Sequence, residues 1–496
     1  NTVSIADGAE LEIGTGTFNA DATFNANSSG VVDFTGAGKL IVSSTVSSLG
    51  SLDDAAGTIE YDGGTQNVLA DNYYNLEIDQ PNAKTAQGAV NVAGTMTVQS
   101  GSEYAVAATT TTVTGTTDVD GTVTITTGTY AANGSSDVDG TISITSTGKY
   151  DADDAFDASN GNITFTGAGR LECSNSVTSL GVLSTGAGTV EYDGGTQNVL
   201  ADTYFNLEID QSGVKTAQGA VNVGGTMTVQ SGSEYAVAAT TTTVTGATTI
   251  SGNLVASTGI FDANGSFNAS GGTINFTGAG TLKLSSSVTS LGTLNDAHGT
   301  VEYDGGTQNV ISDTYNNLSI NTSGTKTASG NITVNGDLTT ENTSGCIFDI
   351  DTRELTAKGA ITVGYRGGLD LKDGTLNISG SSVQSFNSPG SYTDGSNVSI
   401  SAEHVMTDSD DCFEYDYGTV SYSESVNIRL GNRSGGSYGD CFAGLRFQSV
   451  PVPQGATIAS ASIKVKAKYD PHSHATNGST TVRLKIYGND YKTKDG

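Results

Sequence analysis

The sequence of 496 residues has no tryptophan, three methionines, five prolines and only 15% charged residues. Glycine is abundant, with 66 residues, and threonine, serine, asparagine and valine dominate the remainder. Because glycine and β-branched residues are poor helix formers, helix bundles and doubly wound α/β folds are disfavoured. The same residues suit many short strands joined by tight turns. We therefore expect an all-β protein.

Positive charge is also scarce. Lys and Arg together number 21 against 52 Asp and Glu, which gives a formal net charge of −31. Such a polyanion repels nucleic acid and anionic lipid, so we expect no nucleic acid partner. No apolar run approaches the ~20 residues of a membrane-spanning helix, and we expect no membrane insertion. Seven basic residues precede position 350 and fourteen follow it, so the end of the chain presents a different surface.

Cysteine is equally sparse. Cys173 and Cys346 look solitary, whereas Cys412 and Cys441 each lie in an Asp-Cys-Phe tripeptide. We predict a disulfide between Cys412 and Cys441, which fits an extracellular or cell-surface location. The sequence opens Asn-Thr-Val-Ser-Ile without a signal peptide, so either a leader has been removed or the sequence is a fragment.

The chain repeats itself over long distances. Phe-Thr-Gly-Ala-Gly and Glu-Tyr-Asp-Gly-Gly-Thr-Gln-Asn-Val each occur three times, within segments 34–68, 165–199 and 276–310. Successive copies are spaced by 131 and then 111 residues. In addition, Gly94–Gly115 and Gly225–Gly246 are identical. These matches indicate tandem duplication with a third, more diverged copy.

The 20-residue difference between the two spacings predicts the architecture. It falls where the longer copy carries a small repeat, in which Val-Asp-Gly-Thr recurs at Val119 and Val138. A unit of this size is easily gained in a stacked solenoid, whose turns contact only their neighbours. A string of Ig-like β-sandwiches is the alternative, but such closed units would not readily tolerate the insertion.

Within each unit, apolar and polar residues alternate with period two. Leu76 and Ile78 are expected to point inward, as are Val190 and Tyr192, and the strands end at Asp-Gly, Gly-Gly or Asn-Gly turns. We predict a parallel β-solenoid, a right-handed β-helix, over residues 1–395. At roughly 20–24 residues per turn it would have about 17–19 turns.

The repeats vanish in the last part of the chain. Asp408-Ser-Asp-Asp-Cys-Phe, Cys441-Phe-Ala-Gly-Leu-Arg-Phe and Pro453-Gln-Gly-Ala-Thr-Ile form an ordered series. This region resembles the DNRLRE-type, carbohydrate-binding-like domains, and the resemblance implies an antiparallel, jelly-roll-like β-sandwich over 396–496. The inserted Cys412 and the ending Lys-Thr-Lys-Asp-Gly depart from the family pattern. The domain is then truncated, or a partner supplies the missing strands.

The upstream units resemble, more loosely, the Gly-Thr-Val-Glu-Tyr repeats of large microbial surface proteins that act as adhesins, stalks or fibres. Glu60, Glu191 and Glu302 recur in these units. A solenoid would separate them by on the order of 25 Å, too far for an acid–base pair. We interpret them as outward-facing strand residues and expect no enzyme activity.

Oxygen ligands for Ca²⁺ cluster in the acidic segment of the last region. Asp408, Asp410, Asp411 and Glu414 are the candidate ligands, and a solvated acidic loop is the other interpretation. Residues 151–154 form a weaker candidate. Among many Asn-x-Ser/Thr sequences, Asn133, Asn264 and Asn477 are the expected glycosylation sites.

Two functions follow from these expectations. The first is an extracellular structural protein that assembles end to end, as a homopolymer, into a fibre, sheath or surface projection. The second is a stalked adhesin whose last region binds cell-surface polysaccharide through Tyr415, Tyr417, Tyr422 and Tyr438. A virion fibre and a β-helical polysaccharide-processing enzyme are lesser alternatives.

Overall fold

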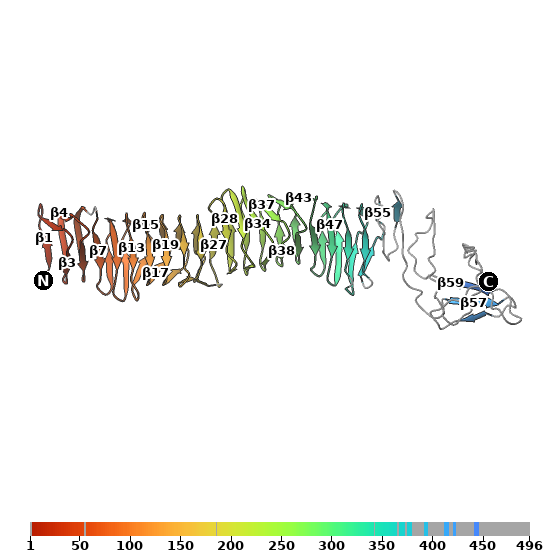
Figure 1. Ribbon diagram of the computed structural model, residues 1–496, viewed down its shortest axis with the longest axis horizontal. Helices are drawn as coiled ribbons and strands as arrows, with labels where there is room; N and C mark the ends of the chain where they lie inside the picture. Colours follow the sequence, from red (N-terminus) through yellow and green to blue (C-terminus); the bar gives the residue numbers. More distant parts are fainter. Residues whose placement is uncertain are drawn as a thin grey trace, which may run out of the picture. The chain divides into compact units, whose positions relative to one another are not determined.

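The structure is a computed structural model that describes residues 2–378, apart from 54–55, 185, 342, 365–366 and 373, together with four short strands farther along the chain. Residues 2–378 form a parallel β-solenoid of about 18 turns (Figure 1). The part of the chain that the structure describes contains strands and no helix, and so no helix that could cross a membrane. Parallel pairing between successive turns rules out the Ig-like sandwiches for this part, because those are antiparallel.

Most turns consist of three short strands, and each strand pairs in register with the strand one turn later. The longest sheet runs unbroken from the first long repeat to the third. Its strands are β9 (Asn72–Tyr73), β12 (Val90–Val92), β15 (Thr110–Val113), β18 (Thr129–Ala132), β21 (Lys149–Ala152), β24 (Arg170–Cys173), β27 (Thr189–Tyr192), β30 (Asn206–Ile209), β33 (Met227–Val229), β36 (Thr248–Ile250), β39 (Phe267–Asn268) and β42 (Val288–Ser290).

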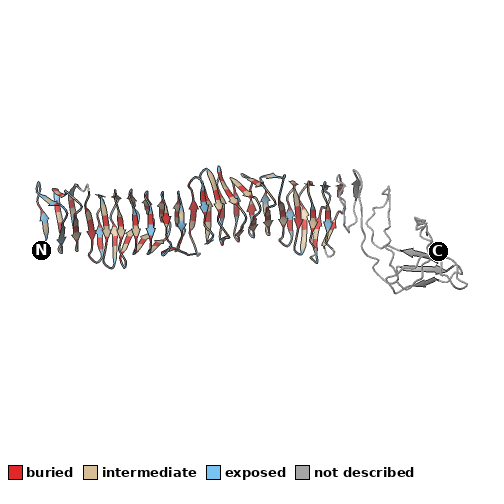
Figure 2. Cartoon of the chain, viewed as in Figure 1, coloured by how far each residue is buried: buried red, intermediate tan, exposed pale blue. Residues whose placement is uncertain are grey.

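The core runs along the interior of the solenoid, and its residues come from every second position of the strands (Figure 2). The expected inward residues Leu76, Ile78, Val190 and Tyr192 are all buried, which confirms the period-two interpretation. Ten tyrosines are among the largest fully buried side chains. Their rings fill the interior, and Tyr130 stacks on Tyr150 with 5.0 Å between ring centroids.

The inserted unit of the longer repeat is one turn of the solenoid. Val119, in β16 (Thr117–Val119), pairs directly with Val138, in β19 (Ser136–Val138), so the two copies of Val-Asp-Gly-Thr lie one above the other. Turns in this part advance by 19 to 21 residues. The sequence therefore gained one layer without disturbing its neighbours, as expected.

Each long repeat contains one shorter turn, which we call the junction turn. The junction turns begin at Thr58 in β7 (Thr58–Tyr61), at Thr189 in β27 and at Thr300 in β44 (Thr300–Tyr303). Thr58 pairs with Asn75 only 17 residues later, and the other two turns have the same length. They hold the repeated Glu-Tyr-Asp-Gly-Gly-Thr-Gln-Asn-Val sequence.

The length of each long repeat is not a whole number of solenoid turns. Equivalent strands of successive repeats therefore lie on different faces of the solenoid. β27 is the twentieth strand after β7, and β44 is the seventeenth after β27. With three strands to a turn, the repeats advance by six and two-thirds and by five and two-thirds turns. β7, β27 and β44 accordingly belong to three different sheets, so the same surface motif is displayed on each of the three faces in succession.

Beyond the solenoid the structure describes only strands. β56 (Ser391–Asp394) pairs in parallel with β55 (Thr375–Ile378). A three-stranded antiparallel sheet is formed by β57 (Asp411–Tyr415), β58 (Val420–Tyr422) and β59 (Cys441–Leu445). The rest of the region expected to form a sandwich lies outside the described residues.

Candidate functional site

The few basic residues of the solenoid mark its polar sites. Before position 350 each of the seven has one of two environments. Four lie in outward-facing ion pairs, and three are fully buried: Lys39, Lys149, Arg170 and Lys283 in the first group, Lys84, Lys215 and Lys326 in the second. All of them except Lys149 lie on strands that pair with a junction turn, so the candidate functional site is the junction.

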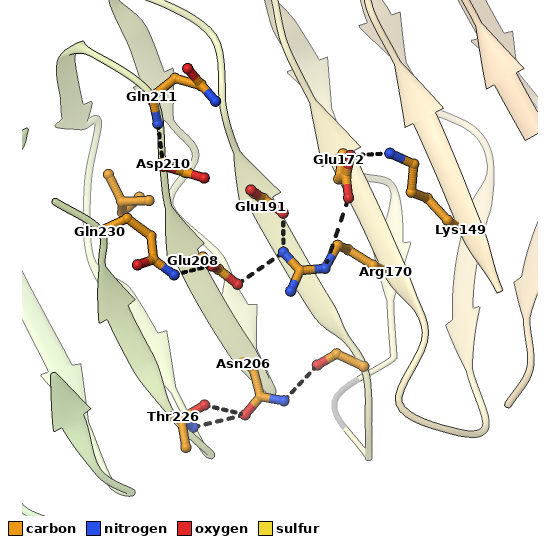
Figure 3. Close-up of polar contacts among 12 residues, drawn as sticks. Lys149, Arg170, Glu172, Glu191, Asn206, Glu208, Asp210, Gln211, Thr226 and Gln230 are labelled. Carbon is orange, nitrogen blue, oxygen red and sulfur yellow. Dashed lines mark hydrogen bonds and ion pairs between the residues drawn. The ribbon is translucent and has the colours of Figure 1, made fainter. Parts of the chain in front are cut away.

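The largest ion-pair ladder crosses the junction turn of the second repeat (Figure 3). Glu172, Glu191 and Glu208 occupy the same register position on β24, β27 and β30. The Arg170 guanidinium bonds to Glu191 and lies 2.9 Å from Glu208. The Lys149 ammonium lies 2.5 Å from Glu172. Carboxylates stacked about 4.8 Å apart would repel one another, and the two cations between them offset that repulsion.

The central carboxyl of this ladder titrates unusually. Burial raises the pKa of Glu191 to about 7, with Arg170 opposing the rise and Glu208 and Glu172 adding to it. A carboxyl of this kind can act as a general acid in a cleft. Here it is covered by its ion-pair partners on the outer surface of a sheet, and the arrangement ties three turns together instead.

Related ion pairs occur on the other two faces, as a ladder at the first junction and as a single pair at the third, where Ser319 takes the place of the next glutamate. Lys39 bonds to Glu60 and Glu77, at 2.7 and 2.6 Å. Lys283 bonds to Glu302 at 3.0 Å. The recurring glutamates do point outward, as expected, but Glu60 and Glu191 are only 7% and 6% exposed. They lie on different faces and are separated along the axis by about 27–32 Å, at about 4.8 Å per turn.

A second polar cluster lies inside the core. Gln197, in β28 (Gln197–Val199), pairs in register with Lys215, in β31 (Gly213–Ala217), and both are buried. The Gln197 amide donates to the carbonyl oxygens of Cys173 and Asn175, at 2.7 and 2.6 Å, and its own oxygen accepts the Gly194 N–H. These three bonds leave the buried amide well satisfied.

The buried lysine side chain bonds to the tight turn that directly precedes its own strand. The Lys215 ammonium donates to the carbonyl oxygen of Gln211 at 2.7 Å, and Gln211 has a positive φ of 55°. Burial lowers the pKa of Lys215, while Asp193 and Asp210 oppose the change. Gln66 with Lys84 and Gln308 with Lys326 repeat the arrangement in the other copies.

Half of the predicted Ca²⁺ ligands lie outside the described residues. Asp408 and Asp410 are not described, while Asp411 and Glu414 lie on β57. Within the described ranges, no group of three or more His, Cys, Asp or Glu side chains is arranged to hold a metal ion. In the weaker candidate at 151–154, Asp151 bonds to Lys149 at 3.0 Å, and a metal site there stays a prediction.

The structure describes some of the residues named in the cysteine and glycosylation predictions. Cys173 and Cys346 are free and buried, as expected. Cys412 and Cys441 lie on adjacent strands, β57 and β59, where the register pairs them with Gly444 and Tyr415. Their disulfide stays a prediction.

The glycosylation candidates stand at strand ends. Asn133 and Asn264 are exposed and directly follow β18 and β38 (Ile260–Ala263). Asn477 lies outside the described residues, as do Tyr417 and Tyr438, two of the tyrosines expected to bind glycan. Tyr415 and Tyr422 are in β57 and β58. Modification and glycan binding stay predictions.

A shallow groove of about 390 Å³ crosses four turns beside the second junction. Glycines at 213, 232, 252 and 272 line it together with Glu234 and Asn253, which bond to each other at 2.6 Å. No aromatic side chain lines this groove, so it lacks the stacking surface that a sugar ring would favour.

Sequence reasoning missed the Gln–Lys pairs and the ladders. The signal was present, because Lys-Thr-Ala follows the repeated Gln-Asn-Val at the same distance in all three copies. Comparison with protein-family models, with curated proteins and with solved structures finds no match to this chain. The function therefore has to be argued from the solenoid itself.

Proposed function

We propose that this chain is an extracellular structural protein whose solenoid acts as a stiff rod in a fibre, sheath or surface projection, without catalytic activity. The observation that carries the proposal is the continuous parallel bonding of about 18 turns around an apolar core. At about 4.8 Å per turn, the described solenoid extends on the order of 85 Å. Duplication lengthens such a rod without redesign of its core.

The finer features of the rod belong to the same proposal. The connections between parallel strands of one sheet are almost always right-handed, which supports a right-handed β-helix. The antiparallel pairing of β57 with β58 and β59 supports the DNRLRE-like β-sandwich in the last region. That sandwich would join the rod to a neighbour or to a surface.

Assembly would proceed end to end. A parallel sheet grows by adding a strand at its edge. The region beyond residue 400 of one molecule would contact residues 1–30 of the next, where β1 (Val3–Ile5), β2 (Glu10–Ile13) and β3 (Thr17–Ala20) form the first described turn. Electron microscopy of the full chain and of a variant lacking residues 1–30 tests this contact. Filaments that persist after the deletion would disprove it.

A stalked adhesin is the second candidate. Its support is the resemblance of the last region to carbohydrate-binding-like domains. A glycan array probed with the full chain and with a variant lacking residues 401–496 separates the two proposals. Binding that disappears with the last region favours the adhesin, whereas fibres without glycan binding favour the structural role.

A further inference from the structure

The bonding between turns is not uniform along the solenoid. An ordinary pair of turns is joined by three ladders, as where β15, β16 and β17 (Thr122–Ile125) pair with β18, β19 and β20 (Thr141–Ile144). At the second junction only one ladder continues, from β24 to β27. The other two sheets end there and two new sheets begin.

Among the described residues, the strands on the two sides of the junction have no backbone pairing with each other. β25 (Val177–Ser179) and β26 (Val182–Leu183) pair only with the preceding turn. β28 and β29 (Thr203–Tyr204) pair only with the following turn. The third junction has the same pattern, with β41 (Thr281–Leu284) to β44 as the continuing ladder. At the first junction the ladder from β5 (Lys39–Val42) to β7 continues, the one sheet that contains β6 (Val46–Asp53) ends, and two new sheets begin.

Side chains replace part of the missing backbone ladder. The Gln197 amide reaches back to two carbonyl oxygens of the preceding turn, and the Ser174 hydroxyl donates to Asp193 at 2.8 Å. Gln66 and Gln308 make the equivalent bonds at the other junctions. A few side-chain bonds are a weaker connection than two strand ladders, since each hydrogen bond contributes only modestly to stability and the ladders contain more of them.

The edge of the apolar core is also more exposed at the junctions. Among described residues, most of the partly buried apolar side chains that pack on the core lie there: Leu52, Leu69, Val177, Leu183, Ala187, Leu200, Val288, Leu294 and Ile311. Val182 is 68% exposed. The centre of the core does not differ, because Val199 and Tyr204 of the junction turn are buried as completely as Val123 and Tyr130 of mid-repeat turns.

We infer that the solenoid opens or bends first at the three junctions, while the turns between them stay intact. In a solenoid each turn contacts only its neighbours, so the weakest interface between turns decides where opening begins. The hydrogen bonds of the buried glutamine hold the two turns of each junction together. Under a stretching or bending force, the segment between two junctions then moves as one unit, rather than each turn separately.

Hydrogen exchange of the full chain, followed by mass spectrometry, tests this inference. In the wild type, peptides from 174–205, and the equivalent ones from 43–74 and 285–316, are expected to exchange faster than peptides from 117–165. Gln197→Ala is expected to speed exchange about ten- to a hundred-fold in 174–205 only. The exposed Gln87, whose side chain bonds to the Thr85 carbonyl oxygen, provides the control, and Gln87→Ala should leave 174–205 unchanged.

Gln66→Ala and Gln308→Ala act as independent copies of the same test, each expected to loosen its own junction. Wild-type junction peptides that exchange as slowly as mid-repeat peptides would overturn the inference, and this result needs no variant. Uniform loosening of all turns by Gln197→Ala would overturn it as well, because the effect would then not be local.

Discussion

Gln197 and Lys215 pair in register on successive turns and both point into the core. They are polar residues in an interior that is otherwise almost entirely apolar. Their hydrogen bonds end on backbone carbonyl oxygens, of the preceding turn for Gln197 and of its own turn for Lys215. The pair thus lies at the junction turn of the second long repeat.

Replacing the buried lysine should destabilise the second junction. Lys215→Ala removes the donor to Gln211 and leaves a cavity, so we expect a loss of about 2–4 kcal/mol in local stability. Lys215→Met keeps the volume of the stem and should recover more than half of that loss. Urea unfolding of the two variants checks the order, and equal losses would contradict a packing role for the stem.

The pH dependence of the free energy of unfolding should show the titration of the Glu191 carboxyl. Its pKa is about 7 in the folded protein and near 4.5 in the unfolded chain. The folded state therefore binds the proton more tightly, and this contribution is complete below about pH 4.5 and lost as the pH rises through 7. Solvent screening of the ladder reduces it to roughly 1–2 kcal/mol.

Glu191→Gln removes the titrating carboxyl. The variant should be more stable than the wild type at pH 8, and the difference should shrink towards pH 5. Thermal unfolding across this range measures both curves. An unchanged pH profile in the variant would show that Glu191 does not titrate as described.

The buried tyrosine pairs should matter through their hydroxyl groups. Tyr192 accepts from the Leu200 N–H and lies 3.1 Å, oxygen to oxygen, from Tyr204, which donates to the Leu200 carbonyl. Tyr192→Phe leaves a buried N–H without its partner and should cost about 1–2 kcal/mol. Tyr74, which is 38% exposed, offers the control Tyr74→Phe, expected to be neutral. A neutral Tyr192→Phe would refute the role of this hydroxyl.

Removal of one whole turn should be tolerated. Because Val119 pairs with Val138, deletion of 120–138 joins Val119 to a second Asp-Gly-Thr in the same register. We expect a folded rod shorter by about 4.8 Å, with a melting temperature within a few degrees of the wild type. Deletion of 120–129 breaks the register and should unfold this part of the solenoid. Circular dichroism distinguishes the outcomes, and equal tolerance of both deletions would contradict the stacking of the turns.

Much of the solenoid was predictable from local pattern. The alternation around Leu76 and Val190 identifies the inward face, and the repeated Val-Asp-Gly-Thr identifies a removable turn, because both signals depend only on neighbouring residues. The offset of one-third of a turn between successive repeats, which places equivalent strands on different faces, was not predictable. It depends on the number of residues in every turn, which within 2–378 varies from 17 at Thr189 to 23 at Leu338.

The polar core residues could not be predicted from the sequence for a different reason. An inward lysine such as Lys215 breaks the rule that charge faces water, and its compensation comes from the Gln211 carbonyl oxygen, whose direction is set by a positive φ. The Glu191 ladder joins residues about 20 positions apart, so it appears only once the length of the turns is known.

Cryo-electron microscopy of the purified full chain tests the central claim most directly. The account predicts a straight-sided rod for residues 2–378, on the order of 85 Å long, with layers about 4.8 Å apart. A string of separate compact lobes, or layers that do not run across the long axis, would contradict it.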